Sequence, residues 1–203
     1  ALISLSNLND DQMAHAKSGM WWENEPQRAL ANNSVAYKGK PEMGTFMREW
    51  VSLYESKSGE RGIFNRQAAD IQVGRNERRE QGHMWGTNPC SEIVLRPYQF
   101  CNLSEVVVRE SDSLDSLKRK VRLSTILGTF QSTLTNFKYL RNIWKKNTEE
   151  ERLLGVSLTG IMDHAVLSKN VDSKRWLEDM KNEAVKVNKK YAEVPVSYTH
   201  LTL

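Results

Sequence analysis

Three side chains within five consecutive residues could act together as a chemical site. Asn88, Cys90 and Glu92 occupy alternate positions of the sequence Asn88-Pro89-Cys90-Ser91-Glu92. In an extended segment alternate side chains share a face, so we expect the amide, the thiol and the carboxylate to line one strip, about 7 Å apart. Pro89 fixes its own φ and pushes Asn88 towards the extended region, which stiffens the loop that presents Cys90.

The carboxylate of Glu92 indicates which chemistry the Cys90 thiol can do. A nucleophilic cysteine needs its thiolate, which positive charge stabilises and a neighbouring anion disfavours. We therefore expect Cys90 to stay a neutral S–H beside a base. A neutral thiol can exchange a hydrogen atom with a substrate, while the carboxylate takes a proton from the same substrate.

These residues lie in a longer stretch that resembles the large chain of ribonucleotide reductases. The sequence Asn88-Pro89-Cys90-Ser91-Glu92-Ile93 is similar to the finger-loop motif of that family. Further segments resemble the family in the same order, at residues 26–34, 58–66, 100–106 and 155–160, and the resemblance covers residues 11–169. It implies that Cys90 carries a thiyl radical, that Glu92 is the base and that Asn88 binds substrate hydroxyls.

Two features separate the classes of this family. Glu92 argues against the strictly anaerobic glycyl-radical class, which resembles the others but lacks this base. The step of eleven residues from Cys90 to Cys101 resembles the adenosylcobalamin-dependent class. In the class served by a separate radical-generating subunit, the second cysteine lies further along. The chain is therefore similar to the adenosylcobalamin-dependent class, and we expect the branch that reduces triphosphates.

The resemblance implies an enzyme that reduces ribonucleotides to deoxyribonucleotides. Homolysis of the cobalt–carbon bond of adenosylcobalamin would produce a radical that takes the hydrogen atom of Cys90, and the thiyl would remove the ribose 3′ hydrogen. Glu92 would accept the 3′-hydroxyl proton as the 2′-hydroxyl leaves as water. Cys101 and a cysteine upstream would supply two electrons and end as a disulfide. The implied partners are the ribonucleotide, nucleotide effectors and a thioredoxin-type reductant, with no nucleic acid and no membrane.

The same resemblance implies that this sequence is an internal piece of a longer chain. It has 203 residues and begins at Ala1 without a methionine, whereas reductases of this family are several times longer. The redox partner of Cys101, the cobalamin contacts and the C-terminal shuttle cysteines would lie elsewhere, so we expect the piece alone to be inactive. Residues 195–203 resemble a translated library adapter, and we interpret them as a non-native tail.

Three alternatives stay open. The same reaction could belong to a large subunit that needs a separate radical-generating subunit. His83, seven residues before Cys90, would suit a hydrolase or transferase with a Cys–His pair, although Glu92 disfavours the thiolate that such an enzyme needs. The third alternative is a non-catalytic nucleotide-binding or structural module. Taken alone, Cys90 would be a small buried side chain, Glu92 a surface carboxylate and Asn88 a turn former.

Charge and cysteine content give little support for several classes of protein, including polyanion-binding, disulfide-rich and metal-binding proteins. The 29 basic and 25 acidic residues leave a net charge of +4, which is weak evidence for a polyanion partner. Two cysteines without a C-x-x-C pattern and four scattered histidines predict neither a disulfide framework nor a metal site. No signal-peptide pattern opens the chain, and no apolar run approaches the roughly 20 residues that span a bilayer, so we expect a cytoplasmic protein.

The helices and strands expected around Asn88, Cys90 and Glu92 indicate an α/β fold. Apolar spacing predicts helices over 42–57, from Ser113 to about residue 134, and over 173–192. Short apolar runs at 92–95, 103–108 and 153–158 predict buried strands, and strands that alternate with helices indicate an α/β unit. By resemblance, residues 1–194 belong to a catalytic ten-stranded α/β barrel, with a central finger loop at about 86–96.

The spacing also predicts which helix faces are buried. In the first helix we expect the core to contain Met43, Phe46, Met47, Trp50, Val51, Leu53 and Tyr54. In the second we expect Leu114, Leu117, Val121, Leu127, Phe130 and Leu134. In the third we expect Trp176, Leu177, Met180, Ala184 and Tyr191. The first set recurs at the three- and four-residue steps of an amphipathic helix, and the other two lie along one expected buried side.

Overall fold

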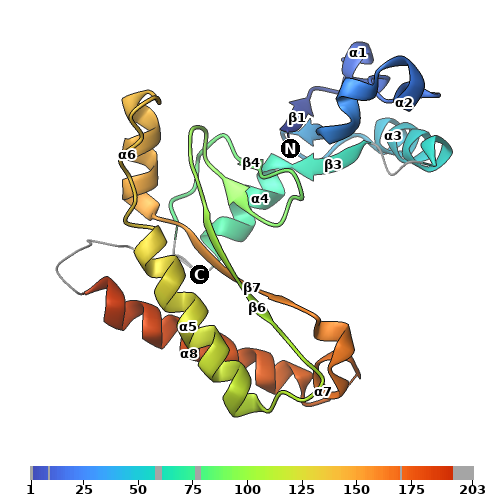
Figure 1. Cartoon of the computed structure of the whole chain (residues 1–203). Coiled ribbons are helices and arrows are strands. Elements are labelled where there is room, and N and C mark those ends of the chain that lie inside the picture. The colour runs from blue at the N-terminus through green and yellow to red at the C-terminus, as the bar shows by residue number, and fades with distance from the viewer. Residues whose placement is uncertain (1, 9, 58–60, 76–78, 170, 194–203) are drawn as a thin grey trace. The chain divides into compact units, whose positions relative to one another are not determined.

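The computed structural model describes residues 2–8, 10–57, 61–75, 79–169 and 171–193 (Figure 1). The chain divides into two compact units, Ala1–Pro97 and Tyr98–Leu203, and each is described by itself. Within the described ranges no helix has the length and apolar character needed to cross a membrane. The tail at 195–203 lies outside the described residues.

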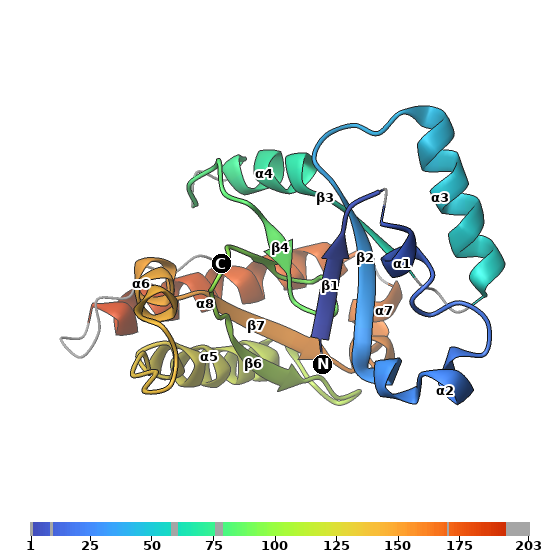
Figure 2. The ribbon, with the colours of Figure 1, turned by 90° about the horizontal axis from the view of Figure 1, so that it is seen from above.

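The first unit is built on a parallel sheet with the strand order β1–β2–β3. Strand β2 (Ala31–Tyr37) pairs with β1 (Leu2–Ser6) on one side and with β3 (Gly62–Asn65) on the other. Figure 2 shows β1 and β2 side by side. Residues 33–37 of this central strand are buried. The sequence pattern predicts no strand here, because the Asn and Ser residues of β2 are uncommon in strands.

Short helices connect these strands. The connection from β1 to β2 contains α1 (Asp11–Ala14), α2 (Trp21–Asn24) and the 3-10 helix Pro26–Leu30. Helix α3 (Met43–Ser56) joins β2 to β3, and α4 (Arg66–Gly74) follows β3. The carboxylate of Glu42 caps α3 by accepting hydrogen bonds from the backbone N–H groups of Gly44 and Thr45, which explains where this helix begins.

The helix predicted over 42–57 is confirmed as α3, but its predicted burial is wrong. Its apolar stripe is exposed at Met43, Met47, Trp50, Val51 and Tyr54. The side that meets the rest of the unit carries Phe46, whose ring centroid lies 6.4 Å from that of Tyr37. The same side carries Glu49, which pairs with the buried Arg61 at 2.5 Å. Because a buried guanidinium needs a carboxylate, this pair fixes the inward side of α3 and turns the stripe away.

The second unit packs helices on a two-stranded parallel sheet. Strand β6 (Asn102–Val107) pairs with β7 (Leu154–Thr159), which confirms the predicted strands to within one residue. Figure 1 shows α5 (Leu114–Gln131) and α8 (Ser173–Ala192) lying together beside these strands. The buried core consists of Val106, Val108, Leu117, Val121, Leu167, Met180 and Ala184. The shorter helices are α6 (Asn142–Glu151), a 3-10 turn at Ile161–Asp163 and α7 (Ala165–Lys169).

Helix α5 buries a different face from the predicted one in its C-terminal half. Leu117 and Val121 are buried as predicted. Leu127, Phe130 and Leu134 are exposed, and the buried positions are instead Ser124, Thr125, Gly128 and Thr129. A step of six residues turns a helix by about 600°, so Leu127 lies about 120° from the face of Val121. A side chain at Gly128 would collide with Leu154 of β7, so glycine allows the close approach.

Helix α8 has the predicted bounds, and most of its predicted inner face is confirmed. Met180 and Ala184 are buried, and the half-buried Trp176 packs against the core. Leu177 is the exception, with 42% of its surface exposed. Among the residues that the structure describes, the strands form three small sheets and no barrel, so the ten-stranded barrel and the single domain over 1–194 stay predictions.

Candidate active site

The three predicted site residues of the first unit lie on the loop of a short β-hairpin. Strands β4 (Gly86–Thr87) and β5 (Val94–Leu95) pair in antiparallel fashion, with Gly86 opposite Leu95 and Thr87 opposite Val94. The loop between them consists of residues 88–93. The hairpin therefore occupies the residues of the predicted finger loop. The strand predicted at 92–95 begins only at Val94.

This loop is a turn and not an extended segment. The backbone N–H of Ser91 donates to the carbonyl of Asn88 at 3.0 Å, and Ser91 has a φ of +64°. The side-chain Oδ1 of Asn88 accepts a hydrogen bond from the N–H of Ile93 at 3.0 Å. The expected strip of alternate side chains is therefore wrong. Asparagine followed by proline favours a chain reversal, here with Pro89 and Cys90 at its centre.

The turn presents both Cys90 and Glu92 to solvent. The thiol of Cys90 makes no hydrogen bond with any residue that the structure describes. Asn88 is a turn former, as asparagine before proline predicts, and its Nδ2 group has no hydrogen-bond partner in the described part of the chain. That group is therefore the part of Asn88 that can bind a ligand. Cys90 is exposed, and it is not the small buried side chain that a cysteine taken alone would be expected to be.

Two arginines hold the base of the hairpin through backbone carbonyls. Arg66, the first residue of α4, donates from Nε to the carbonyl of Trp85 at 2.9 Å. Arg79 donates from Nη1 to the carbonyl of Val94 at 2.7 Å. Hydrogen bonds from charged donors contribute more than neutral ones, so these contacts restrain the base of the hairpin on both strands.

Trp85, the residue that precedes the hairpin, is anchored by its side chain. Its side chain is fully buried, and Nε1 donates to Oδ1 of Asp70 at 2.7 Å. The hydrogen bonds from Trp85 and from the backbone N–H of Gly82 lower the pKa of Asp70. The guanidinium of Arg79 lies 4.7 Å from the centroid of the indole ring, within the range of a cation–π contact.

One contact reaches the tip of the hairpin from the sheet. Nδ2 of Asn32 in β2 donates to the carbonyl of Pro89 at 2.6 Å. That carbonyl belongs to the peptide bond between Pro89 and Cys90, so the contact acts directly on the backbone of the predicted radical cysteine. Asn32 lies in a segment that resembles the reductases, but no spacing rule predicts a contact across 57 residues.

His83 does not support the alternative of a Cys–His pair. Its ring lies edge-on to the ring of Trp85, with the centroids 5.2 Å apart. Its Nε2 atom is enclosed and has no hydrogen-bond partner among the described residues. No hydrogen bond joins this imidazole to the Cys90 thiol in the described part of the chain, so a Cys–His pair stays a prediction.

Cys101 lies in the second unit, directly before β6, and it is half-buried. Its S–H donates to the carbonyl of Asn102 at 3.6 Å. Asn102 is itself fixed, because its backbone N–H and its Nδ2 both donate to the carbonyl of Leu153, at 2.8 and 3.1 Å. On the other side, Phe100 stacks on Trp144 with the ring centroids 4.7 Å apart. The register of a strand therefore fixes the backbone at Cys101.

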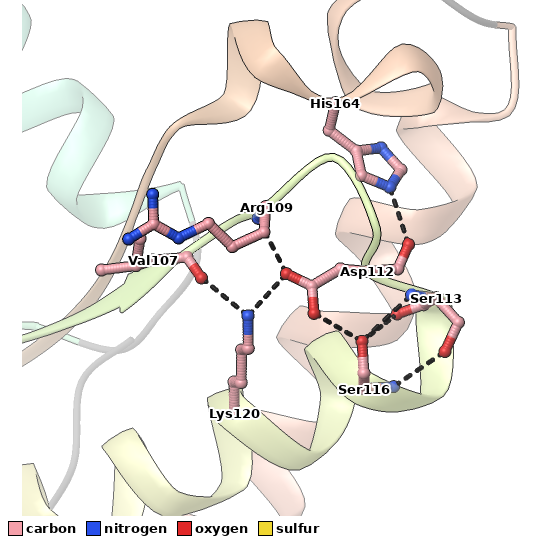
Figure 3. Close-up of polar contacts among 7 residues, drawn as sticks. All are labelled: Val107, Arg109, Asp112, Ser113, Ser116, Lys120 and His164. Carbon is pink, nitrogen blue, oxygen red and sulfur yellow. Dashed lines mark hydrogen bonds and ion pairs between the residues drawn. The ribbon is translucent and has the colours of Figure 1, made fainter.

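A polar cluster that the sequence pattern does not predict closes the turn between β6 and α5 (Figure 3). The carboxylate of Asp112 accepts hydrogen bonds from the N–H of Arg109 at 2.8 Å, from Oγ of Ser116 at 2.7 Å and from Nζ of Lys120 at 2.5 Å. Burial opposes ionisation of Asp112, but the hydrogen bonds from Lys120, Ser116 and Arg109 outweigh it and lower its pKa from 3.8 to about 2.

The buried His164 joins the same cluster to the turn after β7. Its Nδ1 accepts a hydrogen bond from the N–H of Val166, so Nε2 carries the proton and donates to the carbonyl of Asp112 at 2.9 Å. Each of these groups has a partner within the second unit, so we interpret the cluster as structural. The capping box of Ser113 and Ser116 is the sequence signal that could have revealed it.

Two hollows in the described residues lack the size or the lining of a site for adenosylcobalamin, the cofactor that the family resemblance implies. The apolar cavity of about 200 Å³ in the second unit is lined by Val121, Val156, Leu158, Leu177, Met180, Lys181 and Ala184. Ordinary ligand pockets hold about 300–1,000 Å³, so this cavity does not fit a corrin ring with its adenosyl group. A polar hollow of about 670 Å³ in the first unit is lined by Asn7, Asp10, Asp11, Gln12 and Lys38, which offer no apolar wall for the ring. Neither hollow fits the cofactor.

Comparison with known proteins points to one enzyme. Over 145 residues, or 67% of the chain, the sequence is 33% identical to the adenosylcobalamin-dependent ribonucleoside-triphosphate reductase of Lacticaseibacillus paracasei. The match spans 18% of the length of that protein. No protein-family model matches the chain, and no solved structure matches it. The chain is thus related to a part of a ribonucleotide reductase.

Proposed function

We propose that this chain is part of the large chain of a ribonucleotide reductase that converts ribonucleoside triphosphates to deoxyribonucleotides. The observation that carries the proposal is the hairpin loop, which exposes a Cys90 thiol without hydrogen-bond partners in the described residues two positions from the Glu92 carboxylate. The similarity to a reductase over 145 residues supports it. Adenosylcobalamin is the proposed source of the radical, bound by parts of the parent protein outside these residues.

Cys90, Glu92 and Asn88 of the hairpin would each have a separate role in the reaction of the ribose. Cys90, as a thiyl radical, takes the hydrogen atom from the 3′ carbon. Glu92 accepts the proton of the 3′-hydroxyl, which allows the 2′-hydroxyl to leave as water. Nδ2 of Asn88 is the donor that can hold a substrate hydroxyl, because its Oδ1 is occupied by the N–H of Ile93. At the end of the cycle Cys90 returns its hydrogen atom to the 3′ carbon, so it consumes no electrons.

The two electrons for the reduction would come from Cys101 and a second cysteine outside this chain. Their two S–H bonds break and one S–S bond forms. One hydrogen protonates the leaving 2′-hydroxyl, and the other ends on the 2′ carbon, so each deoxyribonucleotide is produced with one water and one disulfide. A thioredoxin-type protein would then reduce the disulfide. The half-buried position of Cys101 directly before β6 suits a thiol that must keep a fixed place while it exchanges partners.

The test uses the full-length protein that contains this sequence, purified without other subunits. With adenosylcobalamin, a dithiol and a ribonucleoside triphosphate, we expect deoxyribonucleotide, measured by chromatography, and we expect none when the cobalamin is left out. The 203-residue chain is the matched control and should make no product, since it contains one cysteine of the proposed redox pair. Activity that required a separate iron or manganese subunit would contradict the cofactor assignment.

A further inference from the structure

We infer that Asn32 is a positioning residue for Cys90, an inference that rests on the proposed function. Its Nδ2 donates to the carbonyl of Pro89 at 2.6 Å, a contact between residues 57 positions apart. The carbonyl of Pro89 and the N–H of Cys90 belong to one planar peptide unit. A donor that holds this carbonyl therefore restrains the rotation of the whole plane from which the Cys90 side chain projects.

Asn32 can act as a fixed point because of its place in the sheet. It lies in β2, the central strand of the parallel sheet, opposite Ile3 of β1. Its neighbours Asn33 and Ser34 are buried. Asn32 itself is exposed, so its amide extends from a rigid strand towards the loop. The carbonyl that it holds is two residues from Ser91, whose left-handed φ of +64° marks the loop as conformationally costly.

The other contacts of the hairpin act at different points. Arg66 and Arg79 bind the carbonyls of Trp85 and Val94 at its base. The hydrogen bond from Ile93 to Asn88 acts within the loop. These contacts fix the shape and the base of the hairpin, whereas Asn32 ties its tip to the sheet. A hydrogen-atom transfer requires the sulfur close to the 3′ carbon, and a misplacement of about 1 Å can cost about 100-fold in rate.

The direct test is the mobility of the Cys90 amide, measured by ¹⁵N relaxation on the 203-residue chain. With Asn32 present we expect an order parameter of about 0.85, as in rigid backbone, and in Asn32→Asp and Asn32→Ala a value below about 0.6. Asn32→Asp keeps the size of the side chain but replaces the donor by a carboxylate that repels the carbonyl. The matched control is Asn24→Ala, at an exposed asparagine of the same unit, and should leave the value unchanged.

The amide of Ile63 in β3 serves as an internal standard, and it should stay rigid in every variant. If Asn32→Asp loosens Ile63 as well, Asn32→Ala gives the same test, because it removes the donor without adding a charge. An order parameter at Cys90 that stays near 0.85 in a folded variant without the Asn32 donor would overturn the inference.

A second measurement separates this inference from the proposed function. In the full-length protein, Asn32→Asp should lower kcat by about 10- to 100-fold and leave the KM of the nucleotide unchanged, because Asn32 would position the thiol and bind no substrate. A merely structural role would lower the melting temperature and leave kcat per folded molecule intact, which would overturn the inference. If the protein made no deoxyribonucleotide at all, the proposed function would fail, while the mobility result for Cys90 would stand.

Discussion

The two cysteines proposed for catalysis are held by different kinds of interaction. Cys90 lies on a hairpin whose base and tip are fixed by the side chains of Arg66, Arg79 and Asn32, each donating to a backbone carbonyl. Cys101 precedes a strand that is paired along its length with β7 and backed by an apolar core. Polar contacts of the first kind determine the orientation of an exposed loop, whereas apolar packing of the second kind determines the stability of a whole unit.

This difference suits the two proposed roles. A thiol that removes a hydrogen atom from a substrate must project from the surface into a site that the rest of the protein completes. A thiol that forms a disulfide must be kept at one distance from its partner, which a strand does better than a loop. We therefore expect substitutions around Cys90 to change activity at nearly constant stability, and substitutions in the core of the second unit to change stability first.

The largest effect on stability is expected from a core residue of the second unit. Leu117→Ala should lower the free energy of unfolding of the chain by about 2–5 kcal/mol, because Leu117 is fully buried and its truncation leaves a cavity. Urea denaturation monitored by circular dichroism measures the change. A loss below about 1 kcal/mol would show that the core does not support this unit.

A smaller effect is expected from the polar cluster. Asp112→Asn should cost about 1–3 kcal/mol at neutral pH, because it weakens the hydrogen bonds from Lys120 and Ser116. The folded pKa of Asp112, about 2, lies below its ordinary value of 3.8. Its contribution is therefore complete above about pH 4 and disappears as the pH falls through about 2.

Urea denaturation of the wild-type chain and of Asp112→Asn, each between pH 6 and pH 2, measures this pH dependence. The difference between their free energies of unfolding should become smaller as the pH falls towards 2. A difference that stayed constant down to pH 2 would show that the Asp112 carboxylate does not act through its charge.

The smallest effect distinguishes the two faces of α5. Leu127→Ala makes the same chemical change as Leu117→Ala on the same helix, but Leu127 is 65% exposed. We expect a change below about 0.5 kcal/mol in the same urea denaturation. A loss of unfolding free energy as large as that for Leu117→Ala would show that Leu127 is buried. The helix would then be rotated to the face that the sequence pattern predicts.

The sequence predicts the elements of the second unit well, because local signals determine them. The capping serine at 113 and the apolar spacing of residues 173–192 fix two helices to within a few residues. The burial of α3 and of the C-terminal half of α5 could not be predicted in the same way. An ion pair with Arg61 determines the inward side of α3, and Ser and Thr residues occupy the inner face of α5. The buried faces of both helices depend on contacts between distant segments, and the spacing of apolar residues carries no information about such contacts.

The candidate site divides in the same way. The motif at 88–92 predicts which residues carry the chemistry, and Asn-Pro at its start is a turn signal, so the hairpin could have been predicted in place of an extended strip. The contacts of Asn32 and Trp85 could not have been predicted from the sequence, because each joins elements that are distant in the sequence.

The most direct measurement is deoxyribonucleotide formation by the Cys90→Ser variant of the full-length protein. Serine keeps nearly the size of cysteine, so nucleotide binding, measured by equilibrium dialysis, should survive. The O–H bond of serine is too strong to supply the hydrogen atom, so no deoxyribonucleotide should form with either a dithiol or thioredoxin as the reductant. Measurable formation of deoxyribonucleotide by Cys90→Ser would contradict the assignment of the thiyl radical to the hairpin.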